Sequence, residues 1–350
     1  MYEFRTSGTY YEIGLQTGKI LKKEMDGIPG FPPKFSEEKI EIGMKYEREV
    51  ERRAPELLEE LRGTADGSGV DYDVLATFEL SPLRMRPSCT VMAIAGAHTR
   101  SGLPILARNH EWLEGDGDYL SLCHTRPEGK IGSLGFTFAG MNLSRFGGIN
   151  EAGLALSSAA ASFEDSGPGV MFNVATRWIL DNCSTVEEAA AFLMKAPKVW
   201  GVAYLMIDRN NTIVKVEAHR ERTKVTHLEE GFGMVTLLFD SPEMRGYNDY
   251  GTNLSDLYYS RKEFIPRWFV RNRGKIDHDK IIEALKDHEH KMCDHFFDGR
   301  DNYGVCWSWI VTIGEDDALV CAGPPCKNEY KRYPLSRGPP YGPRILEEAY

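Results

Sequence analysis

Apolar positions in the first quarter of the chain recur at the spacing of helices. Ile13, Ile20 and Leu21 share one face of a predicted helix, and Thr9 and Glu12 ahead of them have the spacing of a capping box. Further helix starts are indicated at Ser36, Pro55 and Asp71. We therefore predict that roughly the first eighty residues are helical.

The pattern changes at Cys89 to short apolar runs bounded by turns, which is typical of strands. Residues 89–95 and 103–107 flank a turn and predict a hairpin, in which Pro104 shifts the second strand toward an edge or a bulge. Further strands are expected at residues 119–125, 134–139, 145–149, 154–158, 202–207, 212–216, 223–227, 234–239, 306–313 and 318–321. Further helices are expected at residues 172–182, 186–195, 255–268 and 279–287. This mixture predicts an α+β fold of antiparallel sheets covered by helices.

Composition places the chain among globular proteins and narrows its partners. Of 350 residues, 42% are apolar and 27% charged, and we find no repeat or long linker, so residues 1–350 are expected to form a single domain. The net charge of −10 argues against nucleic-acid and anionic-membrane partners. No apolar run suits a membrane span or a signal peptide. The seven cysteines are odd in number and widely spread, which favours reduced thiols in the cytoplasm.

Cys89 lies where helical pattern gives way to strand pattern. A cysteine at the start of an inner strand is usually a small buried apolar residue. The polar cluster Arg108 to Trp112 (Arg-Asn-His-Glu-Trp) closes the predicted hairpin. Because a hairpin folds the chain back on itself, this cluster returns to the level of Cys89. Cys89 and this cluster together suggest a nucleophile with charged neighbours. The ordinary alternative is that the cluster forms an ion pair at a strand end.

These residues carry a family resemblance. Cys89 with Thr90 at a strand start, then the 108–112 cluster, resembles the acyl-coenzyme A:6-aminopenicillanate acyltransferase family. Its members are autoproteolytic N-terminal nucleophile (Ntn) hydrolases, related to choloylglycine hydrolases and penicillin V acylases. Further matching stretches are residues 11–18, 61–67, 148–154 and 321–326. Their order and spacing extend the resemblance over nearly the whole chain.

The resemblance implies a four-layer αββα sandwich and a precursor that cuts itself between Ser88 and Cys89. The products would be a helical piece, residues 1–88, and a larger piece, residues 89–350, that begins at the nucleophile. No cofactor is expected. A free thiol titrates near ~8.5 and an α-amino group near ~8, so an N-terminal cysteine carries its own nearby base. Its thiolate attacks an amide carbonyl, and the acyl group passes to water or another acceptor.

The resemblance also assigns roles around the nucleophile. Glu111 stands where the family generally has an aspartate that orients the nucleophile's amine, and it reaches one methylene further. Arg108 would hold the thiolate or carboxylate by its charge. Asn109 is a further orienting residue, and Trp112 a candidate for substrate binding. Without the family, a surface ion pair is the preferred interpretation of this cluster.

The sequence departs from the family at Leu237. Residues 236–244 resemble a stretch in which relatives carry an asparagine that donates to the oxyanion. Leucine cannot donate, and loss of such a donor can lower the rate by ~10²–10³-fold. Another group supplies the donor, or catalysis is weak, or activity is lost. We find no match for the family's distal arginine.

Three functions therefore compete. The first is an Ntn amidohydrolase or acyltransferase acting on small N-acylated amines, amino acids or peptide-like amides. The second is an uncut or inactive member that binds a ligand without turnover. The third is a metal-dependent hydrolase using the run from His288 to His295, whose residue types suit zinc or iron. A solvated helix end is the commoner meaning of such a run, and Cys321 and Cys326 show no metal quartet, so we expect no metal. A homo-oligomer remains open.

Overall fold

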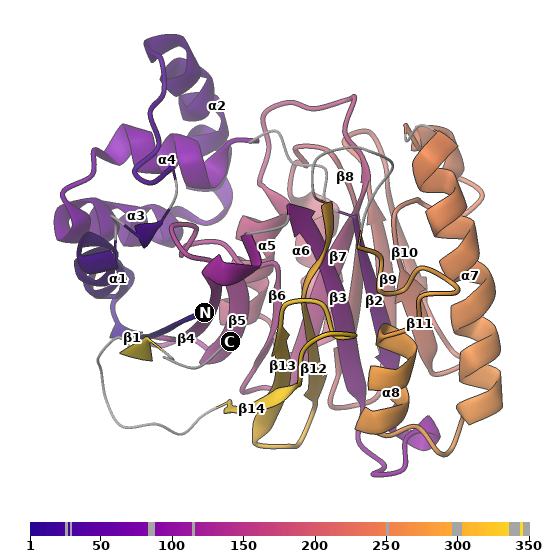
Figure 1. The fold of residues 1–350 in the computed structure, drawn as a ribbon. Coiled ribbons are helices and arrows are strands. Elements are labelled where there is room, and N and C mark those ends of the chain that lie inside the picture. The colour runs from indigo at the N-terminus through magenta and orange to yellow at the C-terminus, as the bar shows by residue number, and fades with distance from the viewer. Residues whose placement is uncertain are drawn as a thin grey trace.

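The computed structural model describes residues 1–24, 27–28, 30–82, 88–113, 116–249, 252–295, 303–335 and 344–345. These residues form two β-sheets packed face to face, with helices on both outer sides (Figure 1). The predicted α+β sandwich of four layers is confirmed. None of the helices in these ranges is long and apolar enough to cross a lipid bilayer.

The first sheet has nine strands in the order β10-β9-β8-β7-β6-β5-β4-β1-β15. Its strands are β1 (Tyr2–Gly8), β4 (Leu120–Pro127), β5 (Ser133–Phe138), β6 (Gly147–Asn150), β7 (Leu154–Ser162), β8 (Gly201–Asp208), β9 (Ile213–Ala218), β10 (Thr223–His227) and β15 (Arg344–Ile345). Neighbours are antiparallel except β1 and β4, which run parallel. The sequence pattern missed β1 because its residues are mostly polar. The N-terminal segment therefore supplies a strand to the sheet as well as helices.

The second sheet has six strands in the order β11-β2-β3-β12-β13-β14. They are β2 (Ser88–Ile94), β3 (Ile105–Leu113), β11 (Phe232–Val235), β12 (Tyr303–Thr312), β13 (Asp317–Ala322) and β14 (Lys331–Pro334). The predicted hairpin of β2 and β3 is present, but β3 continues beyond residue 107 to Leu113. The polar cluster at 108–112 thus lies inside a strand rather than closing one, because it pairs on both sides, with β2 and β12.

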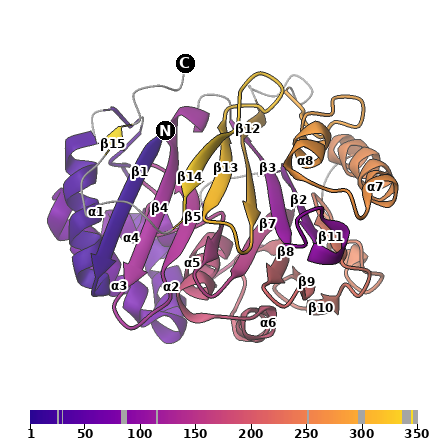
Figure 2. The same cartoon turned by 90° about the horizontal axis from the view of Figure 1, so that it is seen from below.

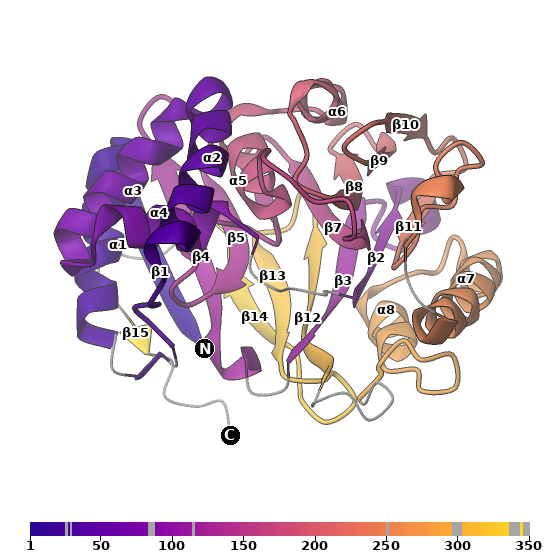
Figure 3. The ribbon, with the colours of Figure 1, turned by 90° about the horizontal axis from the view of Figure 1, so that it is seen from above.

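The helices form the outer layers. They are α1 (Tyr10–Glu24), α2 (Glu37–Arg53), α3 (Pro55–Ser68), α4 (Tyr72–Leu80), α5 (Phe172–Asn182), α6 (Val186–Lys195), α7 (Thr252–Asn272) and α8 (His278–Leu285). Helices α5 and α6 cover the nine-stranded sheet, and α7 and α8 lie against the six-stranded sheet on the opposite side (Figures 2 and 3). The predicted capping box begins α1, where Thr9 and Glu12 exchange hydrogen bonds.

Strand alternation gives β2 and β3 two different faces. Cys89, Val91 and Leu106 belong to the core between the two sheets. Met92 and Ala107 belong instead to the core beneath α7 and α8. Every second residue of the hairpin therefore faces the other sheet, and the residues between face the helices.

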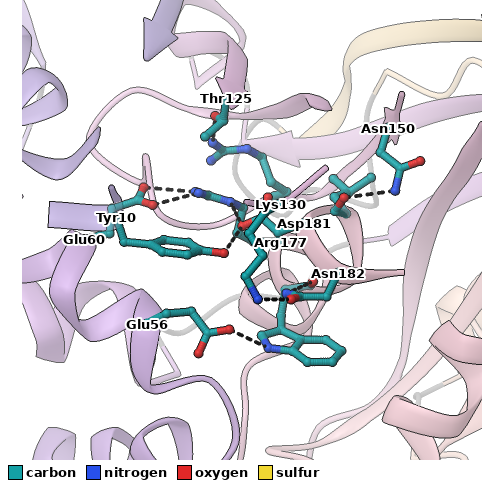
Figure 4. Close-up of polar contacts among 12 residues, drawn as sticks. Tyr10, Glu56, Glu60, Thr125, Lys130, Asn150, Arg177, Asp181 and Asn182 are labelled. Carbon is teal, nitrogen blue, oxygen red and sulfur yellow. Dashed lines mark hydrogen bonds and ion pairs between the residues drawn. The ribbon is translucent and has the colours of Figure 1, made fainter. Parts of the chain in front are cut away.

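The N-terminal helices are tied to α5 by a buried charge network centred on Arg177 (Figure 4). Its guanidinium donates to both carboxylate oxygens of Glu60 in α3, at 2.9 and 2.7 Å, and to Asp181 at 2.8 Å. The hydroxyl of Tyr10 in α1 donates to Asp181 at 3.1 Å. All three charged groups are buried, and burial raises the pKa of Asp181 to about 6 while Arg177 opposes the shift. One cation thus holds two carboxylates from two segments of the chain.

Replacing this cation should destabilise the fold strongly. Arg177→Met removes the partner of Glu60 and Asp181, and breaking a buried pair in this way lowers the free energy of unfolding by about 3–5 kcal/mol. Urea denaturation at neutral pH measures the change. Arg52→Met, which breaks the exposed pair with Glu49, is the control and should stay within about 0.5 kcal/mol of wild type. Equal stabilities of the two variants would contradict a central role for Arg177.

Candidate active site

The thiol of Cys89 lies against the guanidinium of Arg108 inside the sandwich. Arg108 Nη2 is 2.9 Å from Cys89 Sγ, and both side chains are buried. They share the face of β2 and β3 that is turned toward the nine-stranded sheet. A guanidinium stays protonated at any ordinary pH, so Arg108 places a positive charge directly beside the sulfur. The two residues that the sequence analysis paired, Cys89 and Arg108, are therefore in direct contact in the structure.

Arg108 also reaches across to the nine-stranded sheet. Its Nη1 donates to Ser157 Oγ in β7 at 2.8 Å and to the carbonyl of Phe146. Ser157 donates to the same carbonyl at 3.1 Å. Groups on the side of the nine-stranded sheet therefore fix one amino group of the guanidinium, and its second amino group is directed at the sulfur.

Glu111 lies on the opposite face of β3, toward α7. Its carboxylate forms a buried ion pair with Arg261, and Arg261 Nη1 also donates to Thr90 Oγ1 at 2.9 Å. In the strand register Glu111 stands opposite Ser88. The carboxylate is consequently close to the backbone at the start of β2, on the side away from the sulfur.

Arg261 is a site residue that the sequence analysis missed. It projects from α7, is fully buried, and its Nε donates to the carbonyl of Lys291 at 2.9 Å. A signal was present, because Arg261 falls within the apolar stripe formed by Leu257, Ile265 and Trp268 on the same helix. A cation in the middle of such a stripe indicates a buried partner.

Asn109 also faces the helices and does not reach the thiol. Its Nδ2 donates to the carbonyls of Leu285 and Met292, at 2.9 and 2.8 Å. These carbonyls belong to the end of α8 and the turn that follows it. Asn109 therefore fastens this turn to β3. Any effect of Asn109 on the thiol of Cys89 would act through the backbone of β3.

His110 and Trp112 share the thiol face of β3. His110 stands opposite Cys89 in the register, and its ring contacts Trp112, Phe138, Phe146 and Trp307. Burial, and then the nearby Arg108, lower the pKa of His110 well below its usual value, so the imidazole is neutral. Within the described residues neither ring nitrogen has a hydrogen-bond partner. The thiol is thus flanked by one cation and an aromatic wall.

The model of the acyl-coenzyme A:6-aminopenicillanic acid acyl-transferase family matches residues 98–303, more than half of the chain. The chain belongs to this family. The matched region includes β3 with Arg108 and Glu111, and it begins after Cys89. A search of curated protein sequences gives no match.

Three solved structures of hydrolases and acylases are similar to the chain. A variant of conjugated bile acid hydrolase from Clostridium perfringens is 15% identical, with a TM-score of 0.45 over 73% of this chain and 99% of the other. Penicillin V acylase from Agrobacterium tumefaciens is 16% identical, with a TM-score of 0.44 over 66% and 82%. The Caenorhabditis elegans ortholog of N-acylethanolamine-hydrolyzing acid amidase is 16% identical, with a TM-score of 0.44 over 65% and 94%. Similarity at this level does not transfer roles to individual residues.

Leu237, the position that the sequence analysis compared with an oxyanion donor, lies just beyond β11. It is fully buried and packs with Leu257 and Tyr258 of α7. The side chain therefore fills an apolar layer beneath that helix. The side chain of Leu237 itself carries no hydrogen-bond donor.

One cavity lies at the end of the β2–β3 hairpin that is opposite to the thiol. Its volume is about 570 Å³, and it is lined by hairpin turns that include Leu103, Glu151, Arg209 and Glu315. Leu103 belongs to the turn between β2 and β3, whereas Cys89 is at the other end of β2. The cavity therefore does not open onto the sulfur.

A set of potential metal ligands lies beside the turn that Asn109 holds. Atoms of His288, Cys293, His295 and Cys326 all lie within 4.8 Å of one another. The sequence run from His288 to His295 had suggested three of these residues. Cys326 joins them from the turn after β13, and sequence spacing did not reveal it.

Placing an amide at Leu237 tests its packing role. Leu237→Asn buries a polar group among carbon atoms, so the free energy of unfolding should fall by about 1–3 kcal/mol. Acyl-enzyme formation on an N-acyl substrate should not rise. Leu237→Met, which keeps the apolar volume, is the matched control and should change stability by less than about 1.5 kcal/mol. Faster single-turnover acylation in the asparagine variant would place residue 237 at the oxyanion instead.

Proposed function

We propose that the chain is an N-terminal cysteine amidohydrolase or acyltransferase that matures by cutting the bond between Ser88 and Cys89. Its substrates would be small N-acylated amines, amino acids or peptide-like amides. The observation that carries the proposal is the buried contact between Arg108 Nη2 and Cys89 Sγ at 2.9 Å. Membership of a family named for an acyltransferase supports acyl transfer as the reaction type.

Maturation begins with the thiolate of Cys89 attacking the carbonyl carbon of Ser88. The bond from that carbon to the nitrogen of Cys89 breaks, the nitrogen takes up a proton, and a thioester forms at Sγ. Water then opens the thioester, leaving a carboxylate on Ser88 and restoring the thiol. Arg108 supports the first step because it stabilises the anionic sulfur.

Turnover would reuse the same sulfur with a new base. After cleavage the α-amine of Cys89 is free and can accept the thiol proton, because its ordinary pKa near ~8 lies close to that of a thiol. The thiolate attacks the substrate carbonyl, and the protonated amine returns its proton to the leaving nitrogen. Water or an acceptor amine then takes the acyl group from the sulfur.

Glu111 would orient that amine, and the strand register supports this role. It stands opposite Ser88, so a freed nitrogen at Cys89 would arise next to it, while the sulfur points to the other face. Arg261 holds the carboxylate from the helix side. The longer reach of glutamate than of aspartate suits a carboxylate that bridges the strand and a buried guanidinium.

The alternative is an uncut member that binds a ligand without turnover. Two observations favour it: Leu237 supplies no donor, and the thiol of the intact chain is fully buried. Intact mass distinguishes the two functions. Two fragments produced by a cut directly before Cys89 support the enzyme. A single chain of 39.5 kDa that persists on incubation supports the binding protein. Cytoplasmic location, oligomeric state and the absence of nucleic-acid partners stay predictions from composition.

Self-cleavage should require the thiol. Cys89→Ala has no nucleophile, so we expect one intact chain by mass spectrometry, whereas wild type yields residues 1–88 and 89–350. Cys183→Ala, which removes another buried thiol at the end of α5, is the control and should be cut like wild type. Cleavage of the Cys89 variant at the same bond would indicate a contaminating protease and remove the support for autoprocessing.

The negative charge of Glu111 should contribute to maturation in addition to stabilising the fold through the ion pair with Arg261. Glu111→Gln should slow maturation by about 10²-fold, the loss typical of a misplaced reacting group, and Glu111→Asp should be tolerated better. Because Glu111→Gln also leaves Arg261 unpaired, the double variant Glu111→Gln/Arg261→Met is the control for folding. We expect it to regain stability in urea denaturation without regaining the maturation rate. A double variant that matures as fast as wild type would reduce Glu111 to a structural ion pair.

A further inference from the structure

Two segments that are distant in sequence meet at a cluster of two thiols and two imidazoles. His288, Cys293 and His295 lie in the turn after α8, and Cys326 lies in the turn after β13. One ligand atom from each residue lies within 4.8 Å of the other three. We propose that these four side chains bind a zinc ion that joins the two turns.

The distances suit a tetrahedral cation. Zinc bonds of about 2.3 Å to sulfur and about 2.0–2.1 Å to nitrogen separate neighbouring ligand atoms by roughly 3.3–3.8 Å. Cys293 Sγ is 3.6 Å from His295 Nε2, and that nitrogen is 2.9 Å from Cys326 Sγ. The rings of His288 and His295 are stacked with centroids 5.1 Å apart. Small side-chain movements therefore complete the coordination shell.

The donor set and its surroundings favour zinc as a structural ion. Two cysteines and two histidines form a closed tetrahedral set, whereas catalytic zinc keeps a position open for water. Cys293 is buried and His288 is exposed, so the cluster has one protected side and one side from which an ion can enter. A closed set leaves no position for a catalytic water, so the ion would have a structural role.

Local structure holds the ligands in place without the ion. The turn carrying Cys326 is closed by hydrogen bonds from the amides of Lys327 and Asn328 to the carbonyl of Pro324, at 3.0 and 3.2 Å. The other turn is tied to β12, because Val305 N donates to the carbonyl of Asp294 at 2.9 Å. His290, in the same run, is excluded from the quartet by its bond to Asp287 and its stacking on Phe264.

The ion would act on the candidate active site through the turn after α8, which carries His288, Cys293 and His295. The carbonyl of Met292 accepts from Asn109, and the carbonyl of Lys291 accepts from Arg261. These carbonyls belong to the two residues that precede Cys293 in the chain. Zinc would therefore fix the peptide groups that hold Asn109 and the partner of Glu111.

Metal analysis of the full-length chain tests the proposal. Protein expressed with added zinc and purified without chelator should contain about one zinc per chain by mass spectrometry of the metals. Cys326→Ser and His288→Asn should reduce this content at least tenfold. Cys321→Ser and His290→Asn replace a neighbouring cysteine and histidine outside the quartet, and both should keep the zinc. Equal zinc content in ligand and control variants would overturn the site.

A second measurement covers ligand variants that fail to fold. Zinc-free wild type should take up one cobalt ion and show the visible bands of a tetrahedral site together with a thiolate charge-transfer band. Its melting temperature should fall on zinc removal and recover on zinc addition. No uptake of either ion, or a mass lower by two hydrogens from a Cys293–Cys326 disulfide in the protein as purified under reducing conditions, would overturn the proposal. Repeating the analysis in Cys89→Ala separates this result from the fate of the proposed nucleophile.

Discussion

Side-chain alternation along β2 and β3 is the constraint on which the candidate site depends. Four consecutive residues of β3 carry polar groups, and a strand must send them alternately to its two faces. Arg108 and His110 are sent into the space between the sheets with Cys89, and Asn109 and Glu111 are sent toward the helices. The sulfur and its cation are thereby separated from the carboxylate by the thickness of one sheet. In such an arrangement Arg108 contacts the thiol on one face of the sheet, and Glu111 lies near the backbone nitrogen of Cys89 on the other face.

Each face then requires its own compensating structure. On the sheet side, Arg108 donates to Ser157 and to the carbonyl of Phe146. On the helix side, a buried carboxylate would be unfavourable without a partner, and Arg261 of α7 supplies one. The turn after α8 completes that side by offering two carbonyl groups to Arg261 and Asn109. Helices that look peripheral in Figure 1 are therefore part of the site's electrostatic balance.

Sequence reasoning reached the fold class and the pairing of Cys89 with Arg108, because both follow from local patterns. Period-two alternation and turn residues reveal a hairpin, and a hairpin brings its two ends together. It did not reach β1, whose polar residues hide the strand, or the continuation of β3, where the polar residues suggested a strand end. Arg261 and Cys326 were missed for a different reason. Arg261 meets Glu111 only when α7 packs against β3, and Cys326 meets its partners only when the turn after β13 reaches the turn after α8. Such long-range packing leaves no fixed spacing in the chain.

The hydrogen bonds of Arg108 link the position of its charge to the alignment of the two sheets. Its guanidinium belongs to the six-stranded sheet, yet two of its three described hydrogen bonds end on the nine-stranded sheet. The charge next to the sulfur is therefore set by the alignment of the two sheets. A shear of one sheet over the other by about 3 Å, the length of one hydrogen bond, would draw the cation away from the thiol. The electrostatic surroundings of Cys89 would then depend on strain across the sandwich, because displacement of either sheet changes the distance between the guanidinium and the sulfur.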